Sequence, residues 1–142
     1  MTPDQIQIVQ ETFEIVAPSA DAVAALFYER LFTLDPSLRP MFTGDARAQG
    51  DKLMSTLALV VRGLRRPEQI MPAVRRLGER HVIYGVEAAH YQTVGEALLW
   101  TLAQGLGASF TEDVKSAWAA AYTMLAELML EAAAQVPTKR AA

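Results

Sequence analysis

His81 is the residue of this chain whose type and position best suit metal chemistry. It follows a stretch in which apolar residues recur three or four positions apart, at Ile70, Ala73, Val74 and Leu77. This spacing predicts a helix whose apolar stripe includes His81, so the imidazole points toward the core. The carbonyl of Leu77, one turn back, can accept from Nδ1 and leave Nε2 free to bind a metal. The simpler alternative is a core histidine satisfied by a backbone carbonyl or a water.

Two hydrogen-bond donors, Tyr28 and Gln49, are predicted on the inward faces of two other helices. A buried phenol or amide without a partner costs about 1–3 kcal/mol, so each needs an acceptor. The alternative is that the tyrosine hydroxyl bonds a neighbouring carbonyl and that the glutamine lies at the surface. His90 is a second candidate metal ligand, but beside Tyr91 in the first turn of a helix it fits capping or exposure better. We therefore assign metal binding to His81.

Helical periodicity dominates the chain and strand-like alternation is absent, which predicts an all-α domain. Thr2 can cap a first helix, with Pro3 in its first position and Gln5 reaching back in a capping box. Thr111 is the expected cap of the last helix, and Gly85 is the expected left-handed stop of the helix that bears His81. The later helices are expected over about 20–34, 46–63, 67–84, 88–105 and 111–135, with a tight turn at 36–40.

Length and composition describe one folded domain. With 142 residues, the chain is long enough for one hydrophobic core and too short for a second catalytic module of ordinary size. Apolar residues at 51% and charged residues at 20% exclude intrinsic disorder. The net charge of -3 and the short, acid-diluted arginine clusters argue against nucleic-acid binding. Because the chain has no cysteine, it can form no disulfide or thiolate ligand.

No stretch of the sequence matches a targeting or membrane-spanning segment. The first residues carry no basic and apolar leader, and the longest apolar runs, such as 57–61, fall far short of the roughly 18 residues that a membrane span requires. We therefore expect a cytoplasmic protein made of a single domain over 1–142, with a frayed tail over 137–142.

A set of residues in a fixed order carries a resemblance to a known family. The set comprises Tyr28, Pro40-x-Phe42, Gln49, His81, Gly85-Val86, His90-Tyr91 and Ala117-Trp118-x-x-x-Tyr122. In order and spacing it resembles the bacterial single-domain haemoglobins and the globin half of flavohaemoglobins, over nearly the whole chain. The resemblance implies the three-over-three helical globin fold and a protoheme (haem b) cofactor whose iron is held by His81.

The resemblance also implies roles for the residues around the haem. Tyr28 and Gln49 become the distal pair that donates hydrogen bonds to O₂, and Phe42 stacks against the ring. The apolar slot for the ring is assigned to Phe42, Leu53, Leu57, Leu77 and Val86, each of which ordinary core packing would explain equally well. Arg80 and Lys52 are candidates for contact with the haem propionates, or simply with solvent.

The chain departs from the flavohaemoglobin pattern on the last helix. In that family a glutamate, held by the tyrosine that matches Tyr91, polarises the proximal histidine. The matching position here is Ala133, and the nearest carboxylates are Glu127 and Glu131. Glu131 lies two residues away, which turns it about 200° around the helix. We therefore expect that carboxylate to be missing, which puts a strongly electron-donating His81 and efficient O₂ activation in doubt.

The expected function is reversible binding of O₂ for storage or delivery, with NO or CO as further gas ligands. The alternative is a nitric oxide dioxygenase that depends on an external reductase, since the chain has no Gly-x-Gly-x-x-Gly motif and no room for a flavin or nicotinamide domain. A third hypothesis is a haem-free helical signalling module of globin-like shape. We expect a monomer or a weak homodimer.

Overall fold

The computed structural model describes residues 1–136, and this part of the chain is all-α, without a strand. Its α-helices are α1 (Pro3–Val16), α2 (Ala20–Leu34), α3 (Ala46–Arg62), α4 (Pro67–Ile83), α5 (Ala88–Leu106) and α6 (Glu112–Ala134). The short 3₁₀ helices between them are η1 (Ala17–Ser19), η2 (Pro36–Met41) and η3 (Gly107–Ser109). The predicted helices are confirmed to within a residue or two. The tail predicted over 137–142 lies outside the described residues.

Local sequence signals set the ends of these helices. α1 begins with the predicted capping box. The Thr2 hydroxyl accepts from the backbone N–H of Gln5 at 3.1 Å, and the side-chain oxygen of Gln5 accepts from the backbone N–H of Thr2 at 3.0 Å. The hydroxyl of Thr111 caps α6 by accepting from the amide of Val114 at 3.3 Å. α4 ends where Gly85 takes a φ of +85°, a conformation that favours glycine.

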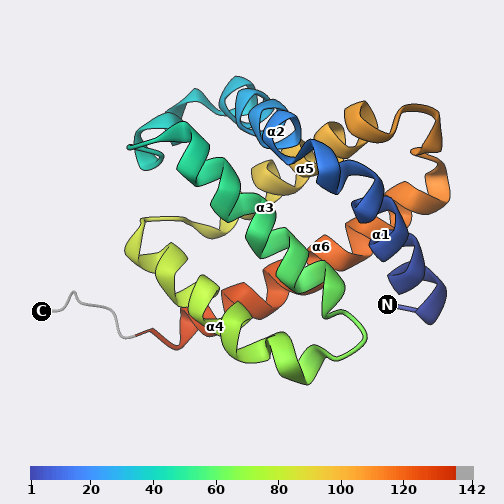
Figure 1. Cartoon of the computed structure of the whole chain (residues 1–142). Coiled ribbons are helices and arrows are strands. Elements are labelled where there is room, and N and C mark those ends of the chain that lie inside the picture. Colours follow the sequence, from blue (N-terminus) through green and yellow to red (C-terminus); the bar gives the residue numbers. More distant parts are fainter. Residues whose placement is uncertain (137–142) are drawn as a thin grey trace, which may run out of the picture.

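The helices pack in two layers of three. α1, α3 and α4 form one layer, which crosses over the layer of α2, α5 and α6 (Figure 1). Between the layers, α4 and α1 pack on α6 and α3 packs on α2, while α2 and α5 pack together within their own layer. This is the predicted three-over-three arrangement, and it places the end of α4, the start of α3 and the end of α2 around one side of the molecule.

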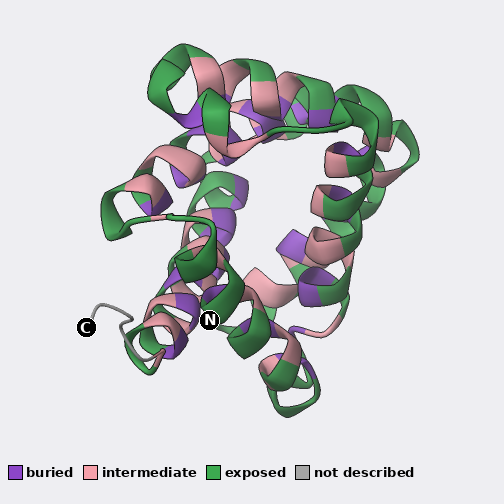
Figure 2. Cartoon of the chain, turned by 90° about the vertical axis from the view of Figure 1, so that its left-hand side faces the viewer, coloured by how far each residue is buried: buried purple, intermediate pink, exposed green. Residues whose placement is uncertain are grey.

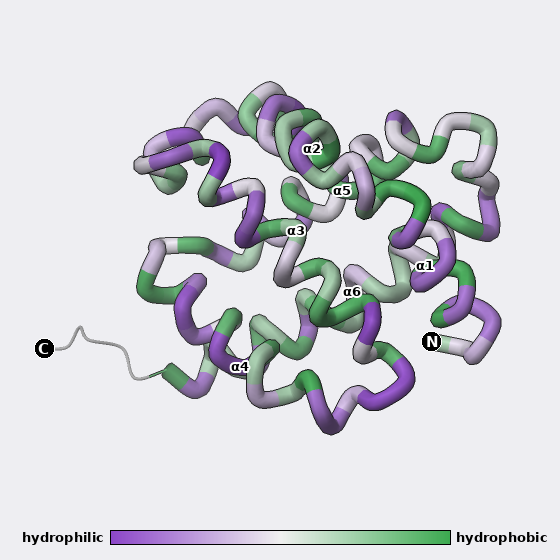
Figure 3. Tube along the Cα trace, in the orientation of Figure 1, coloured by the Kyte–Doolittle hydropathy of each residue, from purple (hydrophilic) through white to green (hydrophobic). Residues whose placement is uncertain are grey.

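Burial and hydropathy follow the layers. Buried residues occupy the inner faces of the helices and exposed residues the outer faces (Figure 2). Hydrophilic stretches occur in α4 and in the corner that precedes α3 (Figure 3).

Within residues 1–136, no helix is both long enough and apolar enough to cross a bilayer.

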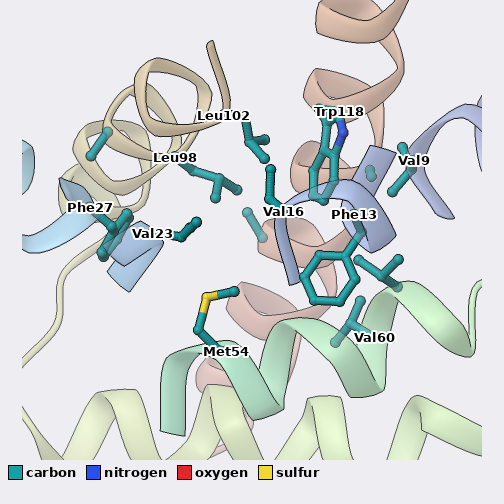
Figure 4. Packing of buried hydrophobic residues seen from close by; sticks show 14 of the residues in the cluster. Val9, Phe13, Val16, Val23, Phe27, Met54, Val60, Leu98, Leu102 and Trp118 are labelled. Carbon is teal, nitrogen blue, oxygen red and sulfur yellow. The ribbon is translucent and has the colours of Figure 1, made fainter. Parts of the chain in front are cut away.

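Trp118 of α6 packs in the core beside Phe13 of α1, with ring centroids 6.5 Å apart (Figure 4). The indole is almost fully buried, and its Nε1 donates to the Thr12 hydroxyl at 2.8 Å. That hydroxyl in turn donates to the carbonyl of Ile8 at 2.7 Å. Both buried polar groups are therefore satisfied, and the pair fixes α1 against α6.

α4 approaches α6 very closely at Gly78. A Cβ atom at this position would lie 2.3 Å from the carbonyl oxygen of Met129, so only glycine fits between the two backbones. His81 lies three residues further along α4. This crossing therefore fixes the position of the histidine relative to α6.

Candidate functional site

His81 lies in the last turn of α4 and is half-buried. Its Nδ1 lies 2.6 Å from the carbonyl oxygen of Leu77, which is the predicted bond. A carbonyl can only accept, so Nδ1 carries the proton and Nε2 carries the lone pair. Burial lowers the pKa of His81 more than the Leu77 carbonyl raises it. The side chain is thus a neutral imidazole with one fixed tautomer, which is the state that binds a metal.

Two tyrosines flank the His81 ring, with centroids 6.1 Å away for Tyr91 and 6.2 Å away for Tyr84. Tyr91 is 8% exposed, and its hydroxyl is buried without a hydrogen-bond partner among the described residues. Its backbone carbonyl accepts from the Tyr122 hydroxyl at 2.5 Å. Tyr84, the residue that directly follows α4, was not predicted as part of the site, although its spacing of three residues from His81 could have indicated it.

Within residues 1–136, no carboxylate of α6 forms a hydrogen bond with Tyr91. Glu127 and Glu131 are both exposed to solvent, and Ala133 is half-buried. Neither glutamate forms a hydrogen bond with the buried Tyr91 hydroxyl, and no other described residue does so. The expectation drawn from Ala133, that the polarising carboxylate is missing, stays a prediction.

His90 performs a capping role at the start of α5. Its Nδ1 accepts from the backbone N–H of Glu87 at 2.9 Å, and the Glu87 side chain accepts from the backbone of His90, a reciprocal capping box. This arrangement agrees with the weaker case for His90 as a metal ligand.

Tyr28 of α2 is half-buried, and its ring is packed among aromatic side chains. The ring centroids of Phe27 and Phe42 lie 5.2 and 5.3 Å from it, and that of Phe32 lies 6.1 Å away. Burial raises the pKa of Tyr28 to about 12, so the hydroxyl stays protonated at neutral pH. It donates to the backbone carbonyl of Gln49 at 3.3 Å, a long hydrogen bond.

The side chain of Gln49 lies at the start of α3 and is half-buried. Its Nε2 donates to the backbone carbonyl of Thr43 at 2.7 Å. The structure therefore brings Gln49 and Tyr28 together, but through the glutamine backbone and not through its amide. Thr43 was not predicted, because its contribution is a backbone carbonyl and no residue type signals it.

The apolar residues assigned to the slot share one property, because each is half-buried against the edge of the core. They are Phe42, Leu53, Leu57, Leu77 and Val86. They come from the corner before α3, from α3, from α4 and from the turn before α5. Arg80 and Lys52 are exposed and form no salt bridge within the described residues. A neutral imidazole, partly uncovered apolar side chains and exposed cations suit a flat apolar group that carries a metal and acidic edges.

Two shallow surface depressions lie elsewhere. One borders the ion pair of Arg62 and Glu14, whose side chains meet at 2.9 Å, and the other lies between Ile6, Leu64 and Met124. Neither contains a residue predicted for the site.

The sequence of this chain is similar to one family profile and to several curated relatives. The sequence profile described as globin matches residues 25–129. Flavohemoproteins of Bordetella parapertussis and Deinococcus radiodurans are 31% and 32% identical over 133 residues, which is 92% of this chain and 33% of each relative. The chain thus spans about a third of the length of these relatives.

Solved structures agree with the fold. A bacterial globin from Campylobacter jejuni superposes with a TM-score of 0.84 at 24% identity, covering 94% of this chain and 97% of the other. An engineered carbene transferase from Rhodothermus marinus, named as a candidate nitric oxide dioxygenase, superposes with a TM-score of 0.86 at 30% identity, covering 95% of this chain and 94% of the other.

Proposed function

This chain belongs to the globin family, and from that premise we propose that it binds haem through His81 and takes up O₂ reversibly as a single globin domain. The observation that carries the proposal is the 2.6 Å contact between His81 Nδ1 and the Leu77 carbonyl. It leaves Nε2 as the only ring atom with a free lone pair. When bound, haem supplies an iron with an open coordination position at which a diatomic gas binds.

On the proximal side, the chain holds His81, the proposed metal ligand, in its neutral form. Burial lowers the pKa of His81, so protons compete weakly for Nε2 at neutral pH. The crossing of α4 and α6 at Gly78 fixes the helix that presents the ring. Among the described residues the Tyr91 hydroxyl has no hydrogen-bond partner, so it links no carboxylate of this part of the chain to His81. These residues favour gas binding over strong activation of O₂.

On the distal side, Tyr28 is the donor that distinguishes gases. With a pKa of about 12 it is protonated at neutral pH, and its long bond to the Gln49 carbonyl leaves it free to turn. A ligand whose outer atom carries partial negative charge accepts such a hydrogen bond more strongly than a neutral one. Tyr28, with Gln49 beside it, therefore favours O₂ over CO.

A second candidate function is nitric oxide dioxygenase. It is favoured by the flavohemoprotein relatives and by the Rhodothermus marinus neighbour named for that activity. This function requires a reductase that returns the iron to the ferrous state, and we propose such a reductase as a partner. We further propose that the cofactor is protoheme, that the protein lies in the cytoplasm and that it is a monomer or a weak homodimer.

The test is an oxygenation cycle followed by visible spectroscopy. The ferrous protein exposed to air should give a distinct oxygenated spectrum that returns to the ferrous one under nitrogen. A purified chain without a haem spectrum would favour the haem-free signalling hypothesis. Immediate conversion to the ferric form, without a reversible oxygenated state, would overturn O₂ storage or delivery.

A further inference from the structure

The outer side of the second half of α4 carries three arginines without an ionic partner. Arg75, Arg76 and Arg80 are exposed, and none forms a salt bridge within residues 1–136. They lie opposite Val74 and Gly78, which are buried on the side of α4 that packs on α6. α4 itself lies at one edge of the molecule (Figure 1). The three guanidinium groups therefore face solvent on one side of one helix.

An exposed apolar cluster follows these arginines at the end of α4. Val82, Ile83 and Tyr84 are 39%, 76% and 56% exposed. Single exposed apolar residues are common, but a run of three points to a surface that contacts something else. Ile83 lies three residues after Arg80, so it continues the same side of the helix. We call these six residues the α4 face: Arg75, Arg76, Arg80, Val82, Ile83 and Tyr84.

The charge of this region is opposite to that of the chain. Residues 63–84 contain five arginines and two glutamates, whereas the whole chain has a net charge of -3. The rest of the chain is therefore acidic. A partner with an acidic surface is attracted to the α4 face and repelled by most of the remaining surface, which both steers and orients its approach.

A glutamate within the basic patch favours a protein as the partner over a uniformly anionic surface. Glu79 is exposed and stands between Arg76 and Arg80 in the sequence. A lipid bilayer or a nucleic-acid backbone would place negative charge against this carboxylate as well as against the arginines. A protein can oppose Glu79 with a cation and the arginines with carboxylates.

The α4 face lies on the helix that also presents His81. An α-helix with its side chains is about 10–12 Å across, so a partner docked on the outer side lies roughly that far from the His81 ring on the inner side. Complexes that transfer electrons bury little surface and are transient, which suits a patch of six residues. Position, charge and size thus fit a partner that exchanges electrons.

We propose that the α4 face docks an electron-donor protein with an acidic surface. This inference rests on the proposed function, in which a reductase restores the ferrous state. In the step that docking serves, the donor loses one electron and the ferric iron held by His81 gains it, and no bond is made or broken. The arginines steer the donor, and Ile83 provides the apolar centre of the contact.

Reduction of the ferric protein by reduced flavodoxin, a small acidic flavoprotein, tests the proposal in stopped flow. The double variant Arg75→Glu and Arg76→Glu should lower the second-order rate constant by about tenfold or more at 10 mM ionic strength. At 1 M salt, where charges are screened beyond about 3 Å, parent and variant should agree within about twofold. A parent rate that does not fall with added salt would overturn the proposal. Arg80 is left unchanged in these variants because it is a candidate for contact with the haem propionates.

A second pair of arginines provides the matched control. Arg65 and Arg66 are also consecutive, exposed and without a salt bridge in the part of the chain that the structure describes. They precede α4, so Arg65→Glu with Arg66→Glu changes the net charge equally but leaves the α4 face intact. This variant should slow the reaction by less than about threefold. Equal slowing in the two double variants would show an effect of net charge alone and would overturn the docking surface.

The apolar centre has a control of the same residue type. Ile83→Ser should lower the rate by about threefold or more at both salt concentrations, because loss of an apolar contact is not screened by ions. Ile15→Ser changes an isoleucine of α1 that is 57% exposed and should have no effect. A loss in Ile83→Ser that disappears at 1 M salt, or an equal loss in Ile15→Ser, would contradict the role of Ile83.

Further measurements separate this proposal from its rivals. Sodium dithionite needs no docking surface, so it should reduce all variants at the parent rate, and equal slowing with dithionite would overturn the proposal. Cosedimentation of the parent with phosphatidylglycerol vesicles, or self-association in analytical ultracentrifugation, would overturn it if the variants at Arg75 and Arg76 abolished that binding. A parent protein without a haem spectrum would instead overturn the proposed function, before any rate is compared.

Discussion

At the scale of single residues, burial shifts the pKa values of two candidate site residues in opposite directions. Burial lowers the pKa of the basic His81 and raises the pKa of the acidic Tyr28, so each side chain stays neutral at neutral pH. Neutral histidine offers a lone pair, and neutral tyrosine offers a donor. The first can hold a metal and the second can bond a partly negative ligand.

The first prediction concerns discrimination between gases. A hydrogen bond to a partly charged group is worth roughly 1.5–3 kcal/mol, so Tyr28→Phe should weaken O₂ binding by about ten- to hundredfold. The loss should appear as faster O₂ dissociation in stopped-flow measurements, because the bond forms only after the ligand has arrived. CO dissociation serves as the internal control and should change far less. An O₂ dissociation rate within about twofold of the parent would show that Tyr28 only packs.

The second prediction concerns alkaline stability. The folded pKa of Tyr28 is raised from 10.0 to about 12, so the unfolded chain loses this proton first as the pH rises. The folded protein is therefore destabilised progressively between these two values. Tyr28→Phe should reduce the slope of the unfolding free energy against pH in this window by up to about 1.4 kcal/mol per pH unit. Urea unfolding of the haem-free protein measures it, and equal slopes would contradict the raised pKa.

At the scale of elements, the crossing of α4 and α6 determines where His81 lies. Gly78→Ala would place a Cβ 2.3 Å from the Met129 carbonyl oxygen, and the helices must separate to admit it. We expect a loss of about 1–3 kcal/mol in the free energy of unfolding, despite the better helix propensity of alanine. Gly105→Ala on α5 meets only a Val16 methyl at 3.1 Å and is the control, expected to be near neutral. Equal stability of both variants in urea would contradict the account of the crossing.

Local sequence patterns predicted the bounds and caps of these helices. The contacts between helices could not be predicted in this way. The Thr2 capping box and the bond from His81 to Leu77 could be predicted, because helix geometry alone brings those atoms together. The bond of Trp118 to Thr12 spans 106 positions and depends on how α1 meets α6. The Gln49 amide was expected to point inward, but its partner is set by the loop before α3, whose path no periodic pattern encodes.

At the scale of the whole molecule, the chain matches its flavohemoprotein relatives over about a third of their length. Catalytic turnover of NO needs a supply of electrons to the iron, which a reductase provides. We expect NO consumption by the oxygenated protein to stop after one turnover unless a reductase is added. Sustained turnover by the purified chain with NADH alone would contradict this prediction.

The same argument predicts the effect of restoring a carboxylate. The Tyr91 hydroxyl has no partner among the described residues, and Ala133→Glu should give it an acceptor and lower the reduction potential of the iron through His81. Ala134→Glu places the same charge at an exposed neighbouring position and should leave the potential nearly unchanged. Spectroelectrochemical titration compares the two, and equal potentials would show that position 133 has no special access to the histidine.

The central claim is that His81 holds the haem, and haem occupancy in two histidine variants tests it most directly. The chain has two histidines, so the comparison is complete. His81→Ala should abolish or greatly loosen haem incorporation, seen as loss of the visible haem absorbance per protein. His90→Ala should keep the parent spectrum, because that ring only caps α5. Equal haem occupancy in the two variants would contradict the assignment of His81 as the ligand.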